Sequence, residues 1–181
     1  MPDEALVRDC LLGDEDAWSA LIDKYKSLIF SIPVKYGLPA EDAADIFQSV
    51  CLSLLRDLPD LRQPRALVAW LIKTTARQCA RRKREKQFFA GAFIEEEVMA
   101  DAGPLPETLV QELEREQMLR EAMSEMHPDC VRLIEALFYT NPPLPYDEVA
   151  RSLGLAKGSV GAIRMRCLEK LRLALKKRRF C

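Results

Sequence analysis

Residues 145–172 read PYDEVARSLGLAKGSVGAIRMRCLEKLR and contain two apolar runs at helical spacing. Val149 and Leu153 belong to the first run, and Val160 and Ile163 begin the second, which continues through Cys167, Leu168 and Leu171. Gly154 lies between the runs, and glycine permits the positive φ of a tight turn. The pattern predicts two short helices joined by a turn, a helix-turn-helix whose second helix would lie in the major groove of DNA.

The outer face of the second predicted helix supplies candidate DNA contacts. Gly158 and Ala162 are expected on that face, where such small residues would let a backbone approach another surface closely. The candidates are Lys157, Ser159, Gly161, Ala162, Arg164 and Arg166. Gly161 and Ala162 have no side-chain group that can hydrogen-bond to a base edge, so we expect part of any sequence preference to come from DNA shape and phosphate contacts. The alternative interpretation is an ordinary helical hairpin followed by a solvated basic tail.

The basic residues of the chain are concentrated in two blocks, although the net charge is only −1. Residues 62–86 contain nine Lys or Arg residues and one acidic residue, and residues 157–179 contain the same numbers. A run of like charge is often only a solvated face. Two such blocks, one of them joined to the predicted helix-turn-helix, indicate two surfaces for a polyanion such as nucleic acid.

The six cysteines show no CxxC or Cys/His spacing; they are Cys10, Cys51, Cys79, Cys130, Cys167 and Cys181. Most occupy apolar helical positions, so we predict reduced thiols in a cytoplasmic protein. No phosphate loop, metal-ligand spacing or nucleophile–base constellation occurs, so the sequence predicts neither an enzyme nor a metal or cofactor. The acidic N-terminus predicts no signal peptide, and no apolar run approaches the ~20 residues that a membrane span needs.

Helical periodicity divides the chain into two parts. The predicted helices cover residues 3–12, residues after Asp14 with Pro33 expected to kink or shorten the helix, and residues 40–55, 65–86, 109–126 and 128–139. Residues 88–106, between the helices at 65–86 and 109–126, are acidic and contain Pro and Gly, which indicates a flexible linker. The sequence therefore predicts an all-α protein with helical domains at residues 1–87 and 109–181, joined by an acidic linker at 88–108.

Several short motifs follow one another along these predicted helices. They are Gly13–Trp18 (GDEDAW), Asp42–Gln48 (DAADIFQ), Leu67–Leu71 (LVAWL) with Ala76–Gln78 (ARQ), and Tyr146–Ala150 (YDEVA) followed by Leu153-Gly154. Their order and separations resemble those of bacterial RNA polymerase sigma factors of the extracytoplasmic-function type. That family has two helical domains, called regions 2 and 4. The resemblance implies that residues 1–87 are region 2 and residues 109–181 are region 4.

The resemblance implies a transcription initiation factor that binds core RNA polymerase, directs it to promoter DNA and aids melting. The helix at residues 40–55 is expected to bury its apolar face and to leave the other face, which carries Asp42, free for a partner. The implied polymerase contacts on this helix are Asp42, Asp45, Gln48, Ser49 and Leu52. The implied contacts to the minus-ten element are Arg62, Gln63, Trp70, Lys73, Arg77, Gln78, Arg81 and Arg82. A core position is the alternative expectation for Trp70. The minus-thirty-five element would meet the second domain, and such factors often have an anti-sigma partner.

A second class of function stays open. The protein could be a stand-alone helix-turn-helix regulator that binds operator DNA without polymerase. The sequence shows neither an obvious dimerisation helix nor a ligand pocket, and the second basic block argues for the polymerase-dependent function. Co-purification with core RNA polymerase would distinguish the two.

Overall fold

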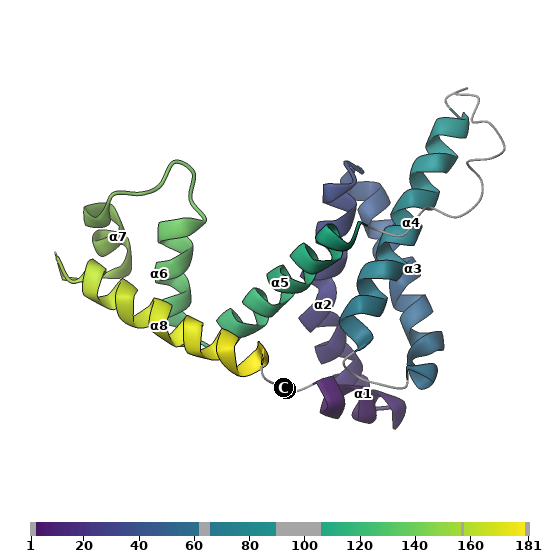
Figure 1. The fold of residues 1–181 in the computed structure, drawn as a ribbon, viewed down its shortest axis with the longest axis horizontal. Coiled ribbons are helices and arrows are strands. Elements are labelled where there is room, and N and C mark those ends of the chain that lie inside the picture. The colour runs from purple at the N-terminus through teal and green to yellow at the C-terminus, as the bar shows by residue number, and fades with distance from the viewer. Residues whose placement is uncertain (1–2, 62–65, 90–105, 157, 180–181) are drawn as a thin grey trace. The chain divides into compact units, whose positions relative to one another are not determined.

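The computed structural model describes residues 3–61, 66–89, 106–156 and 158–179, and all regular structure in these ranges is helical (Figure 1). The predicted all-α fold is therefore confirmed. The chain divides into two compact units, Met1–Arg115 and Glu116–Cys181, each with its own hydrophobic core. Most of the predicted linker falls at residues 90–105, outside the described residues.

The first unit is built from α1 (Asp3–Leu11), α2 (Glu15–Lys35), α3 (Ala40–Asp57), the short 3₁₀ helix η1 (Leu58–Asp60) and α4 (Leu67–Phe89). Helices α2, α3 and α4 pack against one another, and α1 packs against α2 (Figure 1). Their apolar residues recur every three or four positions, which gives each helix one buried stripe. Fully buried members include Leu21, Leu28, Ile32, Val50, Leu54, Leu71 and Ile72. Burying each such side chain stabilises the unit by about 1.5–3 kcal/mol.

The two ends of α2 test two expectations from the sequence. Asp14 caps the helix as predicted, because its carboxylate accepts hydrogen bonds from the backbone N–H groups of Asp16 (2.9 Å) and Ala17 (3.1 Å). Pro33 does not end the helix early, since α2 continues through Pro33 to Lys35, and the alternative expectation of a kink stays a prediction. Pro33 lies in the last turn, where its missing N–H costs only one intrahelical bond, and its ring is buried.

Helix α5 (Glu107–Ser124) contributes to both cores. Leu113 is fully buried in the first core, and Lys35 of α2 pairs with Glu112 at 2.8 Å between Nζ and Oε1. Ala122 is buried in the second core. Residues 109–115 therefore lie in the first compact unit, although the predicted division assigns them to the second domain. The functional domain boundaries at 87 and 109 stay a prediction.

The second unit contains the rest of α5 with α6 (Pro128–Phe138), α7 (Tyr146–Leu153) and α8 (Val160–Arg179) (Figure 1). Its core includes Leu133 and Ile134 from α6, Val149 from α7 and Val160 from α8. Helix α6 begins with Pro128 in its first turn, as predicted. Helices α7 and α8 both contact α6, so α6 holds the predicted helix pair in place.

The turn between α7 and α8 contains the glycine that the sequence indicates. Gly154 has φ 65°, and Leu155 N–H donates to the Ala150 carbonyl at 2.8 Å, which closes the end of α7. Gly158 has φ 86° and precedes α8. Its predicted place on the outer face of the second helix is therefore wrong. It is instead a second turn residue, at a φ that favours glycine.

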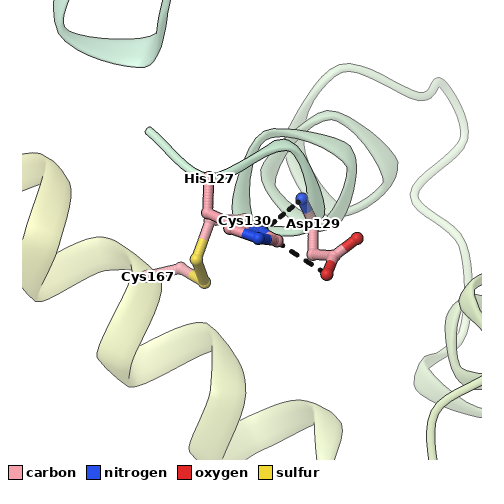
Figure 2. Close-up of a disulfide and its surroundings, with 4 residues drawn as sticks. All are labelled: His127, Asp129, Cys130 and Cys167. Atoms are coloured by element: carbon pink, nitrogen blue, oxygen red, sulfur yellow. Dashed lines mark hydrogen bonds and ion pairs between the residues drawn. A yellow bond between two sulfur atoms is a disulfide. The ribbon is translucent and has the colours of Figure 1, made fainter. Parts of the chain in front are cut away.

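The prediction of reduced cysteines is wrong for one pair. Cys130 of α6 and Cys167 of α8 form a disulfide, with 5.4 Å between their Cα atoms (Figure 2). The packing of α6 on α8 brings these residues within bonding range, although they are 37 positions apart in the sequence. Cys10, Cys51 and Cys79 are free.

Candidate nucleic-acid interface

Helix α4 presents a basic stripe because its apolar residues fix which way it faces. Leu71, Ile72 and Cys79 are fully buried, so the residues on the opposite side of the helix face outward. Lys73, Arg77 and Arg81, three of the predicted minus-ten contacts, are exposed, and Gln78 is half-buried. Arg62 and Gln63 lie outside the described residues.

A hollow of about 240 Å³ lies between α3 and α4. Its lining includes Trp70, Lys73, Arg77 and Gln78 of α4 with Ser53, Arg56 and Asp57 at the end of α3. Trp70 packs partly against the first core and also lines the hollow, so both expectations for this residue agree with its position. Its role in binding stays a prediction.

The hollow is mainly cationic but contains one carboxylate. The Arg56 guanidinium donates to Asp57 at 2.7 Å between Nε and Oδ1. This hydrogen bond holds the pKa of Asp57 below its ordinary value. Asp57 therefore stays ionised near neutral pH and neutralises Arg56. Lys73 and Arg77 are the remaining cations of the hollow that can attract an anion.

An ion-pair cluster joins the first turns of α3 to the second half of α4. Arg82 contacts Asp45 at 2.5 Å and Asp42 at 3.4 Å, and Lys86 contacts Asp42 at 2.5 Å. Asp42 is only 6% exposed, so its predicted place on the solvent face of α3 is wrong. The position lies on the edge of α3 that meets α4, where the two cations compensate the buried charge. Lys86 was not among the candidates, although it lies four residues after Arg82 on the same face.

The other polymerase candidates lie nearer to solvent. Asp45 and Gln48 are exposed, and Ser49 is half-buried. Leu52 is 69% exposed, and Leu55 one turn further along α3 is 57% exposed. Exposed apolar side chains beside polar ones are typical of a surface that binds another protein.

The start of α8 keeps most of its predicted reading face accessible. Ala162 and Arg166 are exposed, and a Cβ added to Gly161 would meet no atom within 4 Å. Ser159 donates its hydroxyl to the Ala156 carbonyl at 2.7 Å, within the turn before the helix. Lys157 lies outside the described residues.

Arg164 differs from the other candidates because it ties α8 to α7. Its Nη1 donates to the Tyr146 hydroxyl at 2.7 Å, and its guanidinium lies 6.0 Å from the centre of the Tyr146 ring. The Arg164 Nε is buried without a hydrogen-bond partner among the described residues. Sequence reasoning did not link Tyr146 to Arg164, since no local spacing connects residues that lie 18 positions apart.

Two further findings concern metal ions and membranes. The described ranges contain no cluster of three or more His, Cys, Asp or Glu side chains arranged to hold a metal ion. None of the helices at residues 3–61, 66–89, 106–156 and 158–179 is both long and apolar enough to span a bilayer.

These features define an all-helical protein with a basic stripe on α4 and an open, partly basic face on α8, which suits a polyanionic partner. Residues 21–89, which cover α3, α4 and most of α2, match the family model described as sigma-70 region 2. The match supports a sigma-70 factor with a role in transcription initiation. Region 2 belongs to a family of transcription factors, in which it interacts with core RNA polymerase. No curated protein matches the chain.

Proposed function

We propose that the protein is a two-domain sigma factor of the extracytoplasmic-function type. It binds core RNA polymerase in the cytoplasm and directs the enzyme to promoter DNA. The single observation that carries this proposal is the match of residues 21–89 to sigma-70 region 2, because the matched residues include both the basic stripe and the hollow.

The exposed face of α3 is the proposed polymerase contact. Asp45 and Gln48 supply polar groups there, and Leu52 supplies an apolar side chain that is 69% exposed. An apolar anchor surrounded by polar groups is a frequent arrangement at protein interfaces. Asp42 contributes indirectly in this proposal, since its buried carboxylate positions Arg82 and Lys86.

The hollow between α3 and α4 is the proposed site for the minus-ten element. Promoter opening requires a base to leave the stack, at a cost of a few kcal/mol. The Trp70 ring lines the hollow and can stack on a base, while Lys73 and Arg77 can bind the adjoining phosphates. Binding of the extruded base would offset the cost of unstacking it.

The second unit is the proposed reader of the minus-thirty-five element. Helices α7 and α8, with the turn at Gly154, support a helix-turn-helix, and the open face at Gly161 and Ala162 allows close approach to DNA. Arg166 would bind phosphate. Arg164 would act mainly by holding α7 against α8. An anti-sigma protein, the regulator that such factors often have, is a further proposed partner.

Binding and transcription with purified core RNA polymerase test the proposal. We expect the protein to bind core, to support promoter-dependent transcription, and to bind the same DNA only weakly without core. Nonspecific affinities at physiological salt are in the range of about 10⁻⁴–10⁻⁶ M. Tight, site-specific binding by the protein alone, together with no binding to core, would instead establish the stand-alone regulator.

A further inference from the structure

The disulfide between Cys130 and Cys167 links the first turn of α6 to the middle of α8 (Figure 2). Cys167 is 1% exposed and lies on the inner face of α8, whereas its neighbour Arg166 is exposed. The bond therefore holds α8 from its inner side, away from the exposed candidates Ala162 and Arg166. It can affect how firmly α8 is held without covering the atoms that would touch DNA.

The covalent loop closed by this bond contains all of α7. Cys130 and Cys167 are 37 positions apart, so the loop includes most of α6, the whole of α7 and the start of α8. Opening the disulfide leaves this segment held only by noncovalent packing. Cross-links of this kind stabilise a fold mainly by restricting the unfolded chain, and more strongly for longer loops.

Cys130 is the more accessible end of the bond. It retains 8% exposure, and the side chains of His127 and Asp129 beside it are 67% and 66% exposed (Figure 2). Its place in the first turn of α6 puts its sulfur near the positive end of the helix dipole, which favours a thiolate. The negative charge of Asp129 is offset by its pairing with Arg132.

We propose that Cys130 and Cys167 form a reversible thiol–disulfide site that sets the stability of the second unit and, through α8, its affinity for promoter DNA. The DNA part of this inference rests on the proposed function. The cytoplasm keeps most thiols reduced, and disulfides that form there are usually transient and serve catalysis or redox sensing. A disulfide that ties α6 to α8, the helix proposed to read DNA, fits the sensing role.

The exchange is balanced with a small disulfide, RSSR, as the oxidant. The Cys130 thiolate attacks one sulfur of RSSR, the S–S bond of RSSR breaks, and the released RS⁻ takes up the proton lost by Cys130. Cys167 then loses its proton and attacks the Cys130 sulfur of the mixed disulfide. A second RS⁻ leaves and takes that proton. Two cysteine thiols are oxidised and one RSSR is reduced to two RSH, and a thiol in excess reverses both steps.

Equilibration of the folded full-length protein in glutathione buffers tests the redox site itself. We expect the oxidised form to contain two fewer reactive thiols than the reduced form, and mass spectrometry to map the lost pair to Cys130 and Cys167. The conversion should be reversible without unfolding. The melting temperature of the second unit should fall by about 10 °C or more on reduction. A pair that stays reduced in oxidising buffer, or that is reduced only after unfolding, would overturn the proposal.

Cysteine variants test whether the redox response comes from Cys130 and Cys167 rather than from another thiol. The Cys130→Ser/Cys167→Ser double variant should melt like the reduced protein and should not respond to the glutathione ratio. Cys51→Ser is the matched control, because it removes a free, partly exposed thiol from the first unit and should keep the full redox response. If the double variant does not fold, reduction of the unmodified protein gives the same comparison. A redox response that survives in the double variant would contradict the assignment.

Binding of reconstituted holoenzyme to promoter DNA tests the regulatory step. We expect the oxidised form to bind about tenfold more tightly than the reduced form, since the disulfide pre-organises α8. Equal affinities would overturn the regulatory part, while reversible thiol loss and the thermal shift would keep the redox site. Failure of both forms to bind core polymerase would refute the proposed function and leave the thiol and melting results to decide the redox site separately.

Discussion

Arg82 of α4 and Asp45 of α3 form an ion pair, with 2.5 Å between Nη2 and Oδ2. The resemblance to sigma factors implies that Asp45 meets polymerase and that Arg82 meets DNA. The pair therefore connects two surfaces that are expected to bind different partners. A partner that binds Asp45 would compete with Arg82, leave its guanidinium paired with Asp42 alone, and so make its Nη2 available to phosphate. Polymerase binding and DNA binding would then be coupled through one pair.

Replacement of Asp45 by arginine tests the polymerase surface. Asp45→Arg removes an exposed ion pair worth about 0.2–1 kcal/mol, so the melting temperature should fall by less than about 5 °C. Binding to core polymerase should fall at least tenfold if α3 is the docking helix, as measured in a core pull-down. Asp23→Arg is the control, since Asp23 is an exposed acid on α2 that also pairs with a lysine, Lys26, at 2.8 Å. Normal core binding by Asp45→Arg would place the docking surface elsewhere.

Asp42 should stabilise the first unit against unfolding, because its carboxylate is buried between two cations. Asp42→Ala leaves Arg82 and Lys86 without their shared partner, although both can partly rehydrate, since their side chains are 31% and 52% exposed. We expect a loss of about 1–3 kcal/mol, less than for a fully buried pair. Urea unfolding followed by tryptophan fluorescence reports this unit, because both tryptophans, Trp18 and Trp70, lie in it. An unchanged midpoint would show that the cluster does not stabilise the fold.

Arg164 and Arg166 should have separable roles in the second unit. Arg166→Ala should leave the melting temperature unchanged and reduce the salt dependence of promoter binding by about one counterion. Arg164→Ala should destabilise the unit by about 1–2 kcal/mol, because it removes the hydrogen bond to Tyr146 and the packing on its ring.

Calorimetry and binding of holoenzyme at several salt concentrations distinguish these two arginine variants. Tyr146→Phe is the matched variant, since it removes the hydroxyl and keeps the ring. It should lose less stability than Arg164→Ala. If Arg164→Ala melts like the unmodified protein but loses salt dependence, Arg164 binds phosphate directly and the assigned roles are reversed.

The free thiols of the first unit should differ in reactivity. Burial raises the pKa of Cys79 from 9.0 to about 12, and it also raises the pKa of Cys51, which is half-buried. At pH 8 only about one Cys79 side chain in ten thousand is a thiolate. Iodoacetamide should therefore label Cys51 first and Cys79 only after unfolding. Rapid labelling of Cys79 in the folded protein at pH 8 would contradict its burial.

The same shift gives the first unit a pH dependence of known sign. The unfolded chain loses the Cys79 proton near pH 9.0, before the folded chain does at about 12. The contribution of the protonated thiol to stability is therefore complete below pH 9.0 and is lost as the pH rises toward 12. Cys79→Ala should remove this part of the alkaline destabilisation, which urea unfolding at pH 8 and pH 10 would measure.

The helices and the basic stripe could be predicted because they depend on neighbouring residues. A period of three or four residues already places Leu71 and Cys79 inward and Lys73, Arg77 and Arg81 outward, whatever the helix packs against. The turn at Gly154 is equally local, since the residue must accept positive φ. For the same reason the all-α fold and the exposed positions of Asp45 and Arg166 are readable from the sequence.

Tertiary packing decided the positions where the expectations failed. Asp42 lies at the edge of its helix stripe, and only the approach of Arg82 and Lys86 from α4 makes its burial tolerable. Cys130 and Cys167 look like two ordinary apolar positions until α6 packs on α8. Arg164 meets Tyr146 only when the turn folds α8 back onto α7. Helical periodicity tells which side of a helix is apolar, but the partner of a side chain depends on which distant residues the fold brings within a few ångströms.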